Sequence, residues 1–139
     1  MGLEQKVLNA LVIDDNPGVL GLVQALLTAH GVTYASFSTC EEGLAHFLKN
    51  PPLYDLVITD LNQSPTSGAD VALKVKDCSQ GKIPVYIITG GADAALIELA
   101  KRYAGEKRII YKPFKNEKFK DIIDEVRRFK DEVGQPSQL

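Results

Sequence analysis

Five short runs of β-branched and aliphatic residues alternate along the chain with longer segments of helical periodicity. This order is typical of repeated βα units, which build a parallel sheet. The predicted strands are residues 8–13, 32–37, 54–59, 83–88 and 107–111. The first, third and fourth runs are apolar with little alternation, as in strands that helices cover on both faces. We therefore expect these three to be the central strands.

The segments between the strands carry one-sided apolar stripes, which predict amphipathic helices. In the first segment the stripe consists of Val19, Leu22, Val23, Leu26 and Leu27. Pro17 stands where a first helical turn accepts proline, and Gly31 stands where such a helix stops. Ser38 and Glu41 have the spacing of a capping box at the start of the second helix. Further stripes lie within residues 71–78, 96–103 and 119–129.

Length and composition limit the class of protein. A chain of 139 residues, 45% hydrophobic and 24% charged, is large enough for one core and too small for two typical domains. We expect one domain at residues 6–131, with tails at 1–5 and 132–139. The net charge of -2 gives no general attraction for nucleic acid or anionic lipid. We therefore expect no direct nucleic-acid partner.

Membrane and export signals are not visible in the sequence. The apolar runs reach only a few residues, whereas a membrane span needs about 20. The first residues, MGLEQKVLN, lack the basic and apolar regions of a signal peptide. Two cysteines without a CxxC pattern and two distant histidines do not form a metal-binding motif. The sequence thus favours a cytoplasmic protein without a membrane association.

Polar residues stand at the ends of four predicted strands. Asp14 and Asp15 close the first strand, Asp60 the third, Thr89 the fourth and Lys112 the fifth. The carboxyl ends of parallel strands share one edge of the sheet, where ligands bind in such folds. One acid at a strand end is often a helix cap, but three acids, a hydroxyl and a lysine are hard to explain as caps. The pattern favours a common functional site.

The adjacent acids Asp14 and Asp15 need a compensating partner. Two carboxylates about 4 Å apart repel by roughly 1 kcal/mol in bulk water and by about 4 kcal/mol at an effective dielectric near 20. A metal ion, a lysine or a solvated helix start would each relieve this repulsion.

Four segments, VIDDN, DLVITDLN, IITGG and YKPF, resemble the receiver domain of two-component response regulators. They occur in the same order as in that family and at compatible spacing, over about residues 8–130. The resemblance implies a three-layer αβα fold of the flavodoxin-like, CheY-like type. Its five-stranded parallel sheet would have the strand order 2-1-3-4-5.

The resemblance also implies roles at the metal centre. Asp60 would accept a phosphoryl group, and Asp15 would ligate Mg²⁺ directly. Asp14 would do so directly or through water, and the main-chain carbonyl of Asn62 would supply a further ligand. Mg²⁺ suits such a site because it binds carboxylates, waters and phosphate oxygens.

Two further residues would complete the site by resemblance. Lys112 would pair with Asp60 and then with a phosphoryl oxygen, and Thr89 would donate its hydroxyl to another oxygen. Such charge-assisted hydrogen bonds are the stronger ones in proteins.

The sequence departs from the family pattern at two places. The loop after Asp60 commonly carries Met-Pro where this chain has Gln63 and Ser64, although Gly68 keeps its place. Ile109 occupies the switch position that usually holds Tyr or Phe. Because isoleucine is smaller and stiff at its first torsion, we expect the loop at residues 89–93 to carry most of the response to phosphorylation.

Three functions remain open. The first is a receiver that catalyses only its own phosphorylation and dephosphorylation, with a histidine kinase or histidine phosphotransfer protein as donor and an unknown downstream protein as reader. The second is a phosphatase of the haloacid dehalogenase type. That family has an acid two residues after its aspartate nucleophile, where this chain has Asn62. The third is a pseudo-receiver that serves only as an interaction module, although all five residues of the strand-end site are present.

Overall fold

A parallel sheet lies between two layers of helices. The computed structural model describes residues 7–134, apart from the side chains of Pro52 and residues 132–134. The predicted tail at 1–5 and most of that at 132–139 therefore lie outside the described residues. The strands are β1 (Asn9–Ile13), β2 (Thr33–Phe37), β3 (Leu56–Asp60), β4 (Val85–Thr89) and β5 (Ile109–Tyr111). Their order is β2-β1-β3-β4-β5, which confirms the expected topology.

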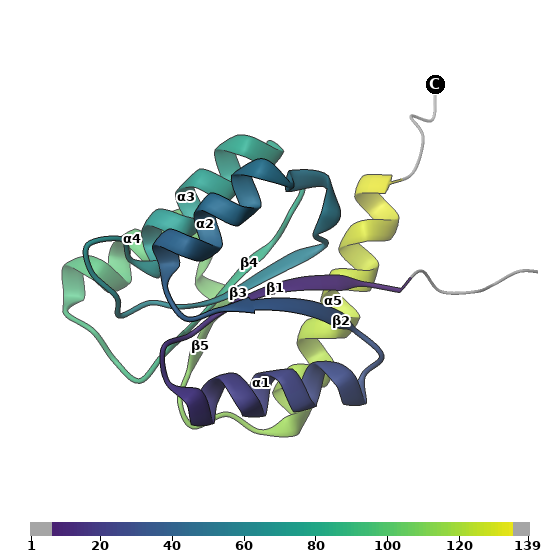
Figure 1. Ribbon diagram of the computed structural model, residues 1–139, viewed down its shortest axis with the longest axis horizontal. Helices are drawn as coiled ribbons and strands as arrows, with labels where there is room; N and C mark the ends of the chain where they lie inside the picture. The colour runs from purple at the N-terminus through teal and green to yellow at the C-terminus, as the bar shows by residue number, and fades with distance from the viewer. Residues whose placement is uncertain (1–6, 135–139) are drawn as a thin grey trace, which may run out of the picture.

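The first four helices connect consecutive parallel strands, and the fifth follows the last strand. They are α1 (Pro17–Ala29), α2 (Cys40–Lys49), α3 (Gly68–Ser79), α4 (Ala94–Ala104) and α5 (Asn116–Gly134), with single 3₁₀ turns η1 (Pro51–Leu53) and η2 (Glu106–Arg108). In Figure 1, α1 and α5 lie on one side of the sheet, and α2, α3 and α4 lie on the other. Among the helices of the described chain, none combines the length and apolar character needed to cross a bilayer.

The core forms on both faces of the central strands. Every residue of β3 and β4 is buried, and so are Ala10 to Ile13 of β1. Leu11, Val57 and Ile87 pack beneath α2, α3 and α4. The alternate residues, such as Ile58 and Tyr86, pack against α1 and α5. Side chains of a strand point alternately to its two faces, so apolar runs without alternation fill both layers.

The start of α2 differs from its prediction by one residue. Thr39, not Ser38, is the N-cap, and its hydroxyl accepts the N–H of Glu42 at 3.1 Å. Glu41 instead accepts the N–H of Thr66 from a distant loop at 3.0 Å. The sequence offers the capping pattern in two neighbouring registers, and the structure uses the second, Thr39 with Glu42.

One residue of the predicted apolar stripe of α1 does not face the core. Val23 and Leu27 are buried as predicted, but Leu22 is 47% exposed. Leu20 packs against the core in its place. Both leucines flank a helical stripe through Val19 and Val23, so periodicity alone does not separate them.

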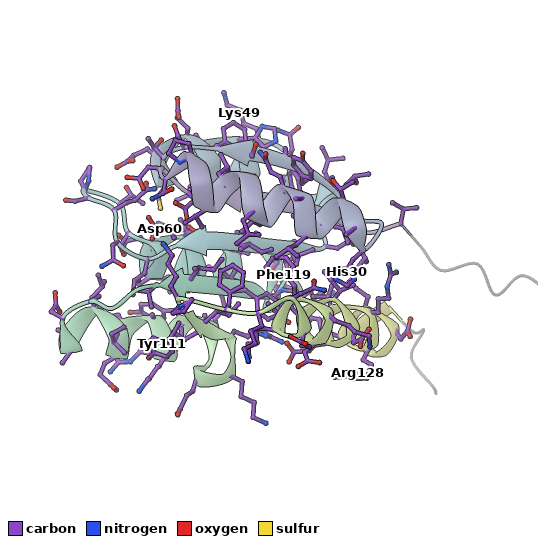
Figure 2. The ribbon with its side chains drawn as sticks, turned by 90° about the horizontal axis from the view of Figure 1, so that it is seen from below. His30, Lys49, Asp60, Tyr111, Phe119 and Arg128 are labelled. Atoms are coloured by element: carbon purple, nitrogen blue, oxygen red, sulfur yellow. The ribbon has the colours of Figure 1, made fainter. Side chains whose placement is uncertain are left out.

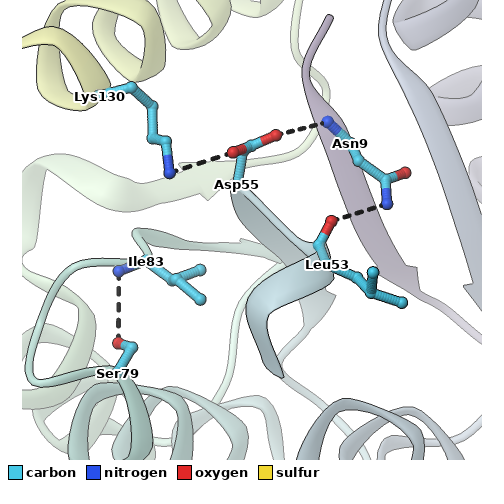
Figure 3. Close-up of polar contacts among 6 residues, drawn as sticks. All are labelled: Asn9, Leu53, Asp55, Ser79, Ile83 and Lys130. Atoms are coloured by element: carbon cyan, nitrogen blue, oxygen red, sulfur yellow. Dashed lines mark hydrogen bonds and ion pairs between the residues drawn. The ribbon is translucent and has the colours of Figure 1, made fainter. Parts of the chain in front are cut away.

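The amino edge of the sheet is held by a polar cluster (Figure 3). Asp55, just before β3, accepts the main-chain N–H of Asn9 at 2.8 Å. Its other oxygen lies 3.1 Å from Nζ of Lys130 on α5. The Asn9 side chain donates to the carbonyl of Leu53 at 2.9 Å. These contacts fasten β1, β3 and α5 together, at the end of the strands opposite to the predicted site.

Candidate functional site

The acid pair lies in the turn between β1 and α1. Asp14 is 3% exposed and accepts the N–H of Asn16 at 2.9 Å, whereas Asp15 is exposed. Asn16 is the N-cap of α1, and its side chain accepts the N–H groups of Gly18 and Val19. Helix capping therefore falls to Asn16.

Asp60 is the last residue of β3 and is 6% exposed. Figure 2 shows Asp60 toward one end of the molecule and His30 toward the other. The carboxylate of Asp60 accepts the N–H of Asn62 at 3.2 Å. A Cβ on Gly68 would lie only 2.4 Å from the carbonyl oxygen of Asp60. Gly68 thus allows the start of α3 to approach the end of β3.

The structure brings Asp14, Asp15 and Asp60 together. One carboxylate oxygen from each lies within 4.8 Å of the others. Oδ2 of Asp14 is buried and has no hydrogen-bond partner among the described residues. A buried, unpaired carboxylate oxygen is costly. A cation held by the three carboxylates would satisfy it, and hard oxygen ligands suit Mg²⁺.

Burial raises the pKa of both Asp14 and Asp60. Hydrogen bonds from the main chain oppose this rise, from Asn16 to Asp14 and from Asn62 to Asp60. The charge of Lys112 also lowers both pKa values, while repulsion from neighbouring carboxylates raises them. Without a metal, the cluster holds more negative charge than its surroundings stabilise.

Lys112 follows β5, and its side chain is half-buried. Its N–H donates to the carbonyl of Thr89 at 2.8 Å, which ties the end of β5 to the end of β4. The side chain passes Gly90, since Cδ lies 4.0 Å from the Cβ position there. The bond to Pro113 is cis. Within residues 7–134, Lys112 makes no direct ion pair with Asp60 or Asp14, and its effect on them is electrostatic.

Thr89 is fully buried at the end of β4. Its hydroxyl donates to Oδ1 of Asn62 at 2.8 Å and accepts the N–H of Gly91 at 3.0 Å. The Asn62 side chain also donates to the carbonyl of Gly91 at 3.1 Å. Asn62 therefore joins the loop after β3 to the loop after β4. The family resemblance implies a role only for its main-chain carbonyl, and the side-chain links could not be predicted because these loops are distant along the chain.

Ile109, at the switch position, is 6% exposed and belongs to the core under α4. Tyr111, two residues later, is 51% exposed. In Figure 2, Tyr111 lies toward the same end of the molecule as Asp60. The buried position thus holds a side chain without a hydroxyl, and the nearby aromatic ring lies at the surface.

The chain resembles known proteins over most of its length. Residues 10–124 match the family model of the response regulator receiver domain. The chain is 31% identical over 87 residues to the transcriptional regulatory protein GlrR of Escherichia coli (strain K12). That alignment covers 63% of this chain but only 19% of GlrR, so the similarity is limited to one segment of that longer protein.

Solved structures share the architecture. A response regulator receiver domain protein from Clostridium thermocellum superposes with a TM-score of 0.81 at 28% identity, covering 91% of this chain and 99% of that one. A CheY-like receiver domain protein from Methanospirillum hungatei JF-1 has a TM-score of 0.79 at 19% identity, covering 91% and 99%, and shows the same fold. With the matched residues spanning most of the sheet and all four strand-end segments, the chain belongs to the response regulator receiver domain family.

Proposed function

We propose that this receiver domain accepts a phosphoryl group on Asp60 with Mg²⁺ and signals by a change of conformation. The cluster of three carboxylates, with its unpaired and buried Asp14 oxygen, is the observation that carries the proposal. Mg²⁺ would be held by Asp14, Asp15, Asp60 and the main-chain carbonyl of Asn62. When bound, it neutralises negative charge on the carboxylates and on the incoming phosphoryl group.

Three residues of the chain would take part in the phosphoryl transfer. A carboxylate oxygen of Asp60 forms the new bond to phosphorus, and the bond from phosphorus to the donor breaks, with its electron pair leaving on the donor. Lys112 offers a cation to the phosphoryl oxygens, and Thr89 offers a hydroxyl. Both are close to the site in the resting protein, where the hydroxyl is held by Asn62. These groups would orient the phosphoryl group and neutralise its negative charge. Phosphoryl transfer needs little other chemistry from a protein.

The donor and the reader are protein partners in this proposal. A histidine kinase or histidine phosphotransfer protein supplies the phosphoryl group, and a further protein reads the phosphorylated state. The receiver catalyses its own phosphorylation and dephosphorylation, and we place it in the cytoplasm, without nucleic acid or a membrane as a direct partner. The curated relative is a transcriptional regulatory protein, so a role within a longer regulator belongs to the same proposal.

The two alternatives have less support. A phosphatase of the haloacid dehalogenase type requires an acid two residues after the nucleophile. In this chain the position holds Asn62, whose side-chain amide binds Thr89 and Gly91. A pseudo-receiver would need no acid cluster, yet Asp14, Asp15 and Asp60 are gathered within reach of one ion.

A labelling experiment tests the proposal. The purified protein, incubated with acetyl phosphate, should gain one phosphoryl group by intact mass only when Mg²⁺ is present. Asp60→Asn should abolish the gain, and Asp121→Asn, at an exposed position of α5, should leave it intact. Undiminished labelling of Asp60→Asn, or labelling of wild type in excess EDTA, would contradict the proposal.

A further inference from the structure

The side chain of Gln63 connects the loop after β3 with the start of α2. Its Oε1 accepts the N–H of Cys40 at 2.7 Å, and its Nε2 donates to the carbonyl of Ser38 at 3.0 Å. Cys40 is the first residue of α2, so its N–H has no partner inside the helix. Thr39 caps the N–H of Glu42, and Gln63 supplies the complementary cap from outside. The first turn of α2 thus depends on a residue of the site loop.

Three more contacts fasten α2 to the same region. Glu41 on α2 accepts the N–H of Thr66 at 3.0 Å. The buried thiol of Cys40 lies 3.6 Å from the hydroxyl of Thr59 and 3.9 Å from the carbonyl oxygen of Asp60. The start of α2 therefore contacts the end of β3 and both halves of the following loop.

Gln63 also lies close to Asp60, three residues later in the same loop. Cys40, whose N–H it accepts, has its thiol 3.9 Å from the carbonyl oxygen of Asp60. Burial raises the pKa of Asp60, and the Gln63 side chain is among the groups that lower it. The Gln63 amide thus binds the start of α2 in the immediate surroundings of Asp60. A planar amide moves as a unit, so a shift of Nε2 toward Asp60 also moves Oε1 and changes its contact with Cys40.

The usual switch position offers a weaker connection. Ile109 is buried and has no hydroxyl, so it makes no hydrogen bond that phosphorylation could exchange. Thr89 is already engaged by Asn62 and Gly91. Among these residues, Gln63 is the polar side chain that links the loop after Asp60 to a separate helix.

Building on the proposed phosphorylation of Asp60, we propose that Gln63 couples the phosphoryl group to the first turn of α2. A phosphoryl group adds about -1.5 to -2 charge and strong acceptor oxygens. These oxygens draw Nε2 away from Ser38, and the N–H of Cys40 loses its acceptor. Gln63 acts as a positioning residue, and residues 38–43 with the loop at 61–67 form the surface that changes between the two states.

Amide exchange measured by NMR tests this coupling. Spectra are compared with and without beryllofluoride and Mg²⁺, which together mimic the phosphorylated site, for wild type, Gln63→Met and Gln24→Met. Gln63→Met removes the amide but keeps a side chain of similar length. Gln24→Met is the matched control, because Gln24 is also half-buried and donates to Ser36 at 2.9 Å on the other face of the sheet.

In wild type and Gln24→Met, exchange at Cys40 should rise on activation by roughly 3- to 10-fold, the factor expected for the loss of one net hydrogen bond. In Gln63→Met, exchange at Cys40 should be fast before activation and should change little on activation. An unchanged Cys40 amide in activated wild type, with residues 89–93 responding, would overturn the coupling while phosphorylation of Asp60 stands. No response at any amide, together with no labelling of Asp60, would overturn both proposals.

Discussion

At the scale of single residues, Gly68 fixes how closely α3 approaches the strand end that carries Asp60. A Cβ at this position would lie 2.4 Å from the carbonyl oxygen of Asp60 and 2.9 Å from Cα of Leu61. Both are main-chain atoms of a buried strand end, so they have little room to move. We expect Gly68→Ala to lower the free energy of unfolding by about 1–3 kcal/mol, as in other overpacked sites, measured by urea denaturation.

Gly21→Ala provides the control for this substitution. Gly21 lies within α1 and is exposed, and a Cβ there would meet nothing within 4 Å. Alanine in a helix is favoured over glycine, so this variant should gain roughly 0.5–1 kcal/mol. Equal effects of the two substitutions would mean that the close approach at Gly68 does not constrain the loop.

The carboxylates of the site set the pH dependence of the metal-free protein. Burial raises the folded-state pKa of Asp14 and Asp60 above the ordinary value of 3.8. At pH values between the two, the folded state therefore holds protons that the unfolded state has released. Stability without metal should therefore fall as pH rises from about 3.8 through the raised folded-state pKa values, and the full penalty should be present at neutral pH.

Asp60→Asn should remove part of this penalty. In EDTA at neutral pH the variant should be more stable than wild type by on the order of 1 kcal/mol. This is the repulsion between two carboxylates about 4 Å apart in bulk water. The difference should shrink as pH falls to 3.8 and below, because Asp60 then becomes protonated in the unfolded state as well as in the folded one. Mg²⁺ should stabilise wild type by mass action. A wild type that is more stable than Asp60→Asn in EDTA at neutral pH would refute this electrostatic picture, and Asp121→Asn is the surface control.

At the scale of the elements, the Asp55–Lys130 pair holds α5 to the sheet. The two side chains are 7% and 28% exposed, and their atoms are 3.1 Å apart (Figure 3). Removing Lys130 takes away a cationic partner of the buried Asp55 carboxylate, which would keep the N–H of Asn9. We expect Lys130→Met to cost about 1–2 kcal/mol of unfolding free energy, less than a fully buried pair because Lys130 is partly hydrated.

Lys120→Met tests whether the effect comes from burial. Lys120 pairs with Asp124 at the same distance of 3.1 Å on the same helix, but the side chains are 67% and 47% exposed. Thermal or urea denaturation should show a change within about 0.5 kcal/mol for this variant. If Lys120→Met costs as much as Lys130→Met, contact with Asp55 is not what holds α5.

The elements themselves were predictable where local pattern and tertiary packing agree. The apolar runs of β1, β3 and β4 predict central strands, and the structure confirms this. The predictions fail where two registers satisfy the same local rule. Ser38 and Thr39 both begin a capping pattern, and packing of α2 against the sheet selects Thr39. Leu20 and Leu22 both fit the stripe of α1, and only Leu20 meets the core.

At the scale of the whole molecule, the sequence located the site through the strand ends. Asp14, Asp15 and Asp60 meet because parallel strands end at a common edge. The links made by Asn62 and Gln63 could not be foreseen, since they join residues 29 and 23 positions apart in separate loops. Only the absence of the family's methionine at position 63 indicated that this loop differs. The roles of the site residues in phosphoryl transfer stay predictions.

The central claim is that Asp60 carries the phosphoryl group. The most direct measurement is peptide mapping by mass spectrometry after wild type has reacted with acetyl phosphate and Mg²⁺, with the acyl phosphate trapped by reduction. We expect the modified residue to be Asp60, within the peptide that contains β3 and the following loop. A modification found on Asp14 or Asp15, or none found in protein that binds Mg²⁺, would contradict the account.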